Sequence, residues 1–370
     1  MFSNYKIAYI VRNAGKDSPH FSLIKSQIEG LALLSSNVSL LCESTDEDQF
    51  KNIQIVKTGS SLLSWLKRTD GFSDQVNKWL TKEKVNFVIG HGEAHPHDLL
   101  IVNSNSLLKS ELIKNSEDND LVQTADQLRT FIQSHKYRLI LTTSQFAKRD
   151  LAMRCQVDLQ TIDFIYPAYD KDIFQFKERQ KKRLELRNQF QIKETDFIVA
   201  LNANSPFETS GLDLALQVLN LLNFNENIKF AIQKGAVQSD KIRNLAEANG
   251  SIARIIELSS KEDEFLFAAD AYFSPALYSD YDQMLVHSLA CGLPSLCSQT
   301  VANSELVQSK QLVKSATDTS GWIEAFEQVV NNKEWTQAIS RQSAERMSAL
   351  NLHLYSQRFA ELLRRRLIGG

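Results

Sequence analysis

One short segment holds an unusual concentration of side chains that could do chemistry. In HGEAHPHD, the histidines His91, His95 and His97 stand beside Glu93 and Asp98. Imidazole and carboxylate groups at such short spacing suit a zinc or iron ion. At the carboxyl end of a strand, the same groups would instead hydrogen-bond a ligand or orient a nucleophile. An ordinary polar loop is the third interpretation.

A second group of candidates follows the apolar run DAYFSPA. Ser279, Asp280 and Asp282 lie on the loop after this run, where their oxygens suit hydrogen bonds to ligand hydroxyls. His287 falls on the helix expected next, and contact with a ligand is one role for it. A solvated acidic loop and a half-buried histidine are the alternatives.

Glycines and cations provide the remaining candidates. Gly15 separates an apolar run from a helical segment, so its backbone could approach a ligand or simply form a tight turn. Lys234 ends another apolar run, and in the second half it is the cation best placed to contact an anionic group of a ligand. The basic run 364–366 lies among leucines, and it suits either an anionic lipid surface or the solvated end of a helix.

These candidates stand at the ends of alternating apolar and amphipathic segments. Strand-like runs of the first half cover residues 6–12, 38–44, 53–59, 86–92 and 137–144. Those of the second half cover residues 196–205, 228–235, 253–260, 270–276 and 293–298. Strands that alternate with helices indicate parallel sheets, so we expect an α/β chain with two Rossmann-like domains facing across a cleft.

The composition is that of an ordinary globular protein. The 370 residues exceed the usual size of one core, and a formal charge of −2 gives no general attraction for nucleic acid. Four scattered cysteines have neither zinc spacing nor a disulfide pattern, which favours a cytoplasmic protein. No GxGxxG or Walker lysine motif occurs, so no nicotinamide or P-loop site is expected.

We place the domains at residues 1–170, 171–348 and 349–370. The first two are an N-terminal and a C-terminal Rossmann-like domain, and the third is a final helix. The charge-dense run from Lys177 to Arg187 has helical period and is interpreted as a solvated connection between them.

The second half resembles a known family. DAYFSPALYSDYDQMLVHSLACGLPSLCS is similar to the donor-site signature of family 4 glycosyltransferases (glycosyl transferases group 1), with SLACGLP at 288–294 the closest match. FETSGLDLALQVL at 207–219 and IYPAYDKDIF at 165–174 resemble two further family segments. NFVIGHGEAHPHDLLIVNS resembles the lipopolysaccharide-core glucosyltransferase branch. The resemblance implies the GT-B fold. It also implies that residues 1–170 form the acceptor-side domain, that residues 171–348 form the donor-side domain, and that the helix of residues 349–370 crosses back to the N-terminal domain.

The family's charged donor-site residues are replaced here. An Arg and a Lys hold the donor diphosphate in the family, whereas Glu208, Thr209 and Ser210 stand in that region of this chain. Two Glu residues contact the donor sugar and ribose in the family, and Ser279 and His287 occupy their places. We assign donor binding to Gly211, Lys234, Ser279, Asp282 and His287, acceptor-side contacts to Gly15, His91 and His97, and catalysis to His95 and Asp280.

Two functions follow from these observations. The first is a retaining glycosyltransferase that moves a hexose from a nucleotide sugar to a surface-polysaccharide or lipid-linked acceptor, with no metal, cofactor or nucleic acid. It would be cytoplasmic, with peripheral contact at the inner face of the membrane as an open alternative. The second is a non-catalytic binding or scaffolding subunit. A metal-dependent hydrolase using the histidines of 91–98 is a weaker third.

Overall fold

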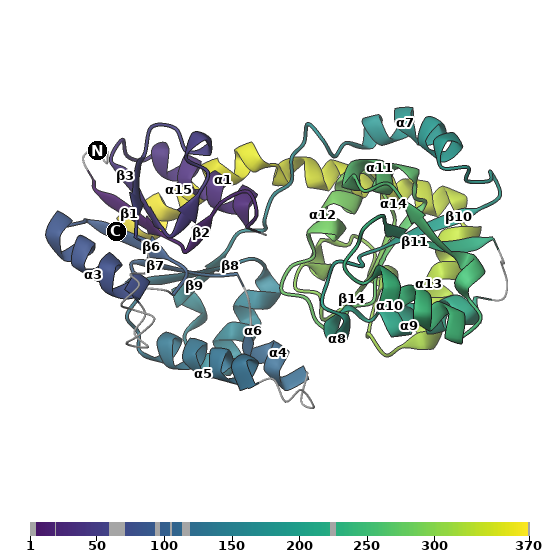
Figure 1. Ribbon diagram of the computed structural model, residues 1–370, viewed down its shortest axis with the longest axis horizontal. Coiled ribbons are helices and arrows are strands. Elements are labelled where there is room, and N and C mark those ends of the chain that lie inside the picture. The colour runs from purple at the N-terminus through teal and green to yellow at the C-terminus, as the bar shows by residue number, and fades with distance from the viewer. Residues whose placement is uncertain are drawn as a thin grey trace. The chain divides into compact units, whose positions relative to one another are not determined.

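The structure is a computed structural model that divides into two compact units (Figure 1). It describes residues 5–18, 20–58, 71–92, 97–103, 106–112, 119–222 and 227–368. Unit 1 comprises Met1–Glu111, Asn115–Ala168 and Leu352–Gly370, and unit 2 comprises Tyr169–Asn351 with Leu112–Lys114. The unit boundaries after Ala168 and Asn351 lie within a few residues of those expected from the sequence.

Unit 1 is built on a parallel sheet. Its described strands are β1 (Ile7–Ile10), β3 (Val38–Cys42), β5 (Gln54–Lys57), β6 (Phe87–Gly90), β7 (Leu99–Val102), β8 (Leu139–Thr142) and β9 (Ile162–Phe164), in the order β5-β3-β1-β6-β7-β8-β9. Its helices include α1 (Phe21–Ala32), α3 (Gly71–Glu83), α4 (Ser106–Leu112), α5 (Asn119–Gln133) and α6 (Gln145–Cys155). The short strands β2 (Asn13–Ala14) and β4 (Ser44–Thr45) pair separately. The central strands are continuous apolar runs because helices cover both faces of a parallel sheet.

The end of the chain belongs to unit 1. Helix α15 (Leu352–Leu363) packs against α1, as the yellow and purple ribbons of Figure 1 show, and a short π-helix covers Arg364–Ile368. The approach is close because Gly30 has no side chain: a Cβ there would lie 2.6 Å from the carbonyl oxygen of Ser356. Gln27 also donates a 2.9 Å hydrogen bond to the hydroxyl of Tyr355.

Unit 2 is a second parallel sheet. Its strands are β10 (Phe197–Leu201), β11 (Ile228–Gln233), β12 (Ile255–Leu258), β13 (Ala271–Ser274), β14 (Ser295–Ser298) and β15 (Val313–Lys314), in the order β12-β11-β10-β13-β14-β15. Its helices are α7 (Phe176–Gln189), α8 (Phe207–Ser210), α9 (Leu212–Leu221), α10 (Ser239–Ala248), α11 (Glu262–Ala268), α12 (Gln283–Ala290), α13 (Thr319–Asn331) and α14 (Lys333–Met347), among the residues described. Phe273 of β13 packs edge-on against Trp322 and Phe326 of α13, with ring centroids 5.0 and 5.1 Å away.

The charged helix α7 differs from the expectation of a solvated connection. It belongs to unit 2 and packs against α11. Arg187, only 6% exposed at its side chain, donates a 2.9 Å hydrogen bond to Asp270 and further bonds to the carbonyl groups of Ala268 and Asp196. The charge density suggested solvation, but a stripe of arginines here meets the half-buried carboxylate of Asp270 and the carboxyl end of α11.

Among the described helices, none combines the length and the apolar character that crossing a membrane requires.

Candidate functional site

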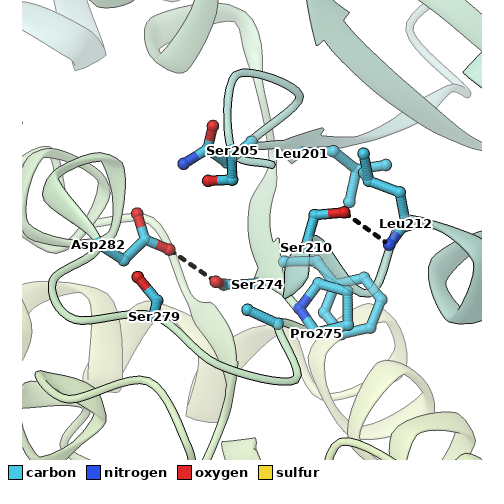
Figure 2. A pocket seen from close by; sticks show the side chains of 11 residues that line it. Leu201, Ser205, Ser210, Leu212, Ser274, Pro275, Ser279 and Asp282 are labelled. Atoms are coloured by element: carbon cyan, nitrogen blue, oxygen red, sulfur yellow. Dashed lines mark hydrogen bonds between the residues drawn. The ribbon is translucent and has the colours of Figure 1, made fainter. Parts of the chain in front are cut away.

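A small hollow lies at the carboxyl ends of β10 and β13 in unit 2 (Figure 2). It is lined by Leu201, Asn202, Ser205, Ser210, Leu212, Phe273, Ser274, Pro275, Ala276, Ser279 and Asp282. Its empty space, including the part open to solvent, is about 290 Å³. The enclosed part is only about 10 Å³, the space of a single water molecule, so a ligand would lie at the mouth of the hollow.

The loop between β10 and α9 forms one wall of the hollow through a close backbone contact. Gly211 has the positive φ of +67° that favours glycine, and it lies directly before α9. A Cβ on Gly211 would lie 2.2 Å from the carbonyl oxygen of Pro275, which leaves no room for any side chain. Gly211 therefore shapes this wall of the hollow, and its role in donor binding stays a prediction.

Several neutral hydrogen-bonding groups in the hollow are available to a ligand. The hydroxyls of Ser205 and Ser279 and the amide nitrogen of Asn202 have no hydrogen-bond partner within the described parts of the chain. Ser210, in contrast, donates to the carbonyl of Phe207 at 2.8 Å. None of the lining residues is a lysine or arginine. The hollow is therefore suited to ligand hydroxyls.

Asp282 forms the opposite wall, and its carboxylate is bound internally. It is the N-cap of α12 and accepts a 3.0 Å hydrogen bond from the backbone N–H of Leu285. The hydroxyls of Tyr272 and Ser274 each donate to its Oδ2 at 2.6 Å. Burial raises the pKa of Asp282, although these three donors favour the ionised form and oppose that shift.

His287 lies outside the hollow lining, in the packing of α12. Its ring stacks on Phe174 with centroids 3.7 Å apart, and its Nδ1 lies 2.7 Å from Oε1 of Glu262. Its Nε2 lies 3.4 Å from the amide nitrogen of Gln283. The side chain is 6% exposed. Both ring nitrogens thus face protein groups, an arrangement typical of a satisfied packing histidine.

The other two candidates of unit 2 also lie outside the lining. Asp280 accepts a hydrogen bond from the hydroxyl of Tyr278, close to the hollow in the same loop. Lys234 follows β11 and is exposed, with its backbone N–H bonded to the carbonyl of Leu258. Its ammonium group forms no ion pair with a described residue. The structure therefore brings Ser279 and Asp282 together in the lining of the hollow, with Gly211 next to it between the lining residues Ser210 and Leu212.

In unit 1, His91 belongs to a chain of hydrogen bonds in which the donor and the acceptor of each bond can be assigned. The hydroxyl of Tyr9 lies 2.9 Å from His91 Nε2, and the amide nitrogen of Asn103 lies 3.4 Å from Nδ1. Burial, with the nearby His20 and His97, lowers the pKa of His91 to about 3, so the ring is neutral. Because the Asn103 amide nitrogen can only donate, Nδ1 accepts and the ring proton is on Nε2, facing Tyr9.

That chain continues into the core of unit 1. Since Tyr9 accepts from His91, its own proton goes to Gln27 Oε1, and Gln27 in turn donates to Tyr355. His91 at the end of β6 is thereby connected to the C-terminal helix α15. A neutral ring with both nitrogens bonded is suited to positioning Asn103 at the edge of the sheet.

The remaining unit 1 candidates have mainly structural contacts. His97 packs on Gly90, where a Cβ would lie 2.9 Å from its ring, and accepts a 3.3 Å bond from the N–H of Gly92. The N–H of Gly15 donates to Asn13 Oδ1 at 2.8 Å, which indicates a tight turn. His95 lies outside the described residues.

The described residues contain no cluster of three or more His, Cys, Asp or Glu side chains that could hold a metal ion.

Asn202, Ser205 and Ser274 line the hollow but were not predicted as site residues from the sequence. Their positions along the chain could have identified them. Asn202 and Ser205 follow one predicted apolar strand, and Ser274 ends another. The carboxyl ends of neighbouring parallel strands lie at the same edge of a sheet. The contact of Glu262 with His287 could not be predicted in this way, because the two residues are distant in the sequence.

The sequence matches no protein-family model and no curated protein. The structure, however, is similar to many solved structures. WaaG, a glycosyltransferase involved in lipopolysaccharide biosynthesis, superposes with a TM-score of 0.75 at 14% identity over 96% of this chain and 99% of its own. Sucrose-phosphate synthase from Thermosynechococcus elongatus gives 0.76 at 12% identity, covering 99% of this chain and 100% of that one.

A third similar structure holds ligands. Anabaena Alr3699/HepE, solved in complex with UDP and glucose, has a TM-score of 0.71 and 12% identity over 98% of this chain and all of its own. At these identities the likeness concerns the fold. It confirms the fold expected from the sequence: the chain has the GT-B fold of the glycosyltransferases, with two Rossmann-like units.

Proposed function

We propose that the protein is a retaining glycosyltransferase that transfers a hexose from a nucleotide sugar to a surface-polysaccharide or lipid-linked acceptor. The observation that carries the proposal is the unit 2 hollow, where Ser205, Ser279 and Asn202 present neutral hydrogen-bonding groups that have no partner among the described residues. Such groups suit sugar hydroxyls, and their position at strand ends is where open α/β sheets bind ligands. The complex of HepE with UDP and glucose supports a nucleotide-sugar donor.

In this proposal the donor sugar lies at the mouth of the hollow, and the protein uses neither metal nor cofactor. Asp280 and His95 are the proposed catalytic groups, and Lys234 is the proposed cation for the departing diphosphate. His91, His97 and Gly15 shape the acceptor side. Catalysis would rest on positioning the two substrates and stabilising the leaving group.

The test is a transfer assay with UDP-, GDP- and ADP-sugars on the wild type and two variants. Ser279→Ala and Ser205→Ala each remove one ligand hydrogen bond, so we expect kcat/KM to fall about tenfold in each. Ser320→Ala, on the exposed side of α13, is the matched control and should leave turnover unchanged. Turnover that is the same in all four proteins would refute this placement of the donor.

A second candidate function is a non-catalytic subunit that binds a glycan or a glycosyltransferase partner. The observation that favours it is the absence of lysine and arginine from the lining of the hollow, combined with the internal contacts of His287. A wild type that binds glycan but releases no nucleotide from any of the three donor classes would select this function.

Peripheral membrane contact through residues 364–366 is a separate part of the proposal, with a cytoplasmic location. Arg366 bonds to the carbonyl of Gln160 and pairs with Asp163 at 3.1 Å, so its charge is partly used within unit 1. Arg365 has a side chain that is 67% exposed, and it is the residue to test. Arg365→Glu should weaken co-sedimentation with anionic vesicles, while Arg341→Glu serves as control.

A further inference from the structure

A cavity in unit 1 lies between helix α1 and residues 48–53, the segment that leads into β5. Its volume is about 410 Å³, compared with about 10 Å³ for the enclosed part of the unit 2 hollow. Ligand pockets usually measure about 300–1,000 Å³. The cavity is therefore large enough to hold a small organic molecule.

This cavity extends towards the amino ends of the strands of unit 1. Ala32, the last residue of α1, and Ile53, directly before β5, both line it. Open parallel sheets bind their substrates at the opposite edge, where the strands have their carboxyl ends. The cavity is thus distinct from the edge at which sugar transfer is proposed, and a ligand bound in it goes beyond the proposed function.

Part of the lining is an apolar surface that the core of unit 1 holds in place. Ile28 and Phe50 are buried members of the core cluster, and Ile53 packs against that cluster. The ring of Phe50 also meets the ring of Phe21 edge-on, with centroids 6.2 Å apart. Asn52 turns the chain before Ile53 with a φ of +64°, a conformation that asparagine adopts more readily than most residues. The apolar surface is therefore formed before a ligand binds.

Two carboxylates of the lining have polar neighbours within the chain. The hydroxyl of Ser356 lies 3.4 Å from a carboxylate oxygen of Glu29, and the ammonium group of Lys16 lies 3.9 Å from Asp48. Both acids would repel a ligand that carries several negative charges, such as a diphosphate. The lining thus disfavours polyanions, whereas a single anionic group can be balanced by the remaining cations.

Those cations are Lys25 of α1 and Lys51 of the facing segment. Their ammonium groups form no hydrogen bond or ion pair with a residue that the structure describes. We propose that the cavity is a binding site for an amphipathic organic monocarboxylate. Its apolar body lies on Ile28, Phe50 and Ile53, and its carboxylate is bound by the two lysines. Apolar burial supplies affinity, and the lysines select the charged form.

The probe is octanoate, titrated calorimetrically into the full-length protein. We expect the wild type to bind octanoate about tenfold more tightly than octanol, which has the same chain length without the charge. The double variant Lys25→Met with Lys51→Met keeps the apolar stems and removes both charges. It should bind octanoate about tenfold more weakly, with no loss for octanol. Excess inorganic pyrophosphate should not displace octanoate from the wild type.

Lys82→Met, at an exposed position of α3, is the control for charge and should leave both affinities unchanged. Ala32→Trp fills the cavity and should abolish binding of both probes. Its matched control is Ser22→Trp, at an exposed position of the same helix outside the lining.

The inference is overturned by any of four results. These are a folded wild type that does not bind octanoate, equal affinities for octanoate and octanol, displacement of octanoate by pyrophosphate, and unchanged octanoate binding in Ala32→Trp. If the double variant does not fold, each single lysine variant provides the same test with a smaller expected loss. No nucleotide sugar enters these titrations, so their failure leaves the proposed function untouched.

Discussion

The imidazole of His287 lies between Glu262 and Phe174. Its Nδ1 is 2.7 Å from Oε1 of Glu262, and its ring centroid is 3.7 Å from the ring centroid of Phe174. The family resemblance would place this residue against the donor ribose. The contacts instead attach α12 to α11 and to the segment that leads into α7. His287 is thus accounted for by packing within unit 2.

His287→Ala should therefore act mainly on stability. It removes a buried stacked ring, so we expect the free energy of unfolding to fall by about 2–4 kcal/mol. Glu262→Gln keeps an acceptor for Nδ1 and should cost much less. Urea unfolding of both variants measures the difference. If the His287→Ala protein kept its stability but lost sugar transfer, the packing role would be contradicted and a direct contact of His287 with the ligand would be supported.

The arginine stripe of α7 should be more important for stability than its charge density suggests. Asp270→Ala leaves Arg187 buried without its carboxylate, and breaking a buried pair typically costs about 3–5 kcal/mol. Glu178→Gln, which breaks the exposed pair with Lys181 on the same helix, is the control and should change little. Equal midpoints in urea for these two variants would show that the Asp270 contacts contribute nothing.

Gly211→Ala should damage the hollow and the stability of unit 2. The added Cβ meets the backbone of Pro275 at 2.2 Å in addition to the unfavourable positive φ, so we expect a loss well above 1 kcal/mol. Gly235→Ala is a close control, because φ is +79° there and nothing lies within 4 Å of the new Cβ. It carries only the backbone cost, about 1 kcal/mol. Thermal unfolding should separate the two, and equal losses would argue against the close contact.

Acid should destabilise unit 1 through His91. Its pKa is lowered to about 3 in the fold, against about 6.5 when unfolded, so the unfolded chain binds the proton more readily between these values. The contribution of His91 is complete above about pH 6.5 and is lost as the pH falls towards 3, by up to about 1.4 kcal/mol per pH unit.

His91→Gln should reduce this pH dependence, because it removes the titrating group at a buried position. Urea unfolding of the wild type and the variant between neutral pH and about pH 4.5 measures the effect. His353→Gln, in the exposed first turn of α15, is the control and should leave the slope unchanged. Parallel curves for the wild type and His91→Gln would contradict the buried, neutral state of His91.

The sequence by itself determined the fold class and many of the strands, although β7, β9 and β15 were not predicted. Apolar runs such as IAYI and FIVAL are buried on both faces, and their alternation with helical segments leaves few architectures other than parallel sheets. It also placed Ser279 after the strand β13, because the residues that follow parallel strands lie at the edge of the sheet where ligands bind.

Only the tertiary structure decided which polar residues are free to bind. Asp282, His287 and Ser279 looked alike as candidates, but two are satisfied by partners such as Tyr272 and Glu262, which α/β packing brings from other elements. A hydrogen bond between residues distant in the sequence leaves no periodic trace, and so availability cannot be read from spacing. The same reason applies to α7. Its arginines were predicted to be solvated, but the fold places Asp270, which is distant in the sequence, beside them.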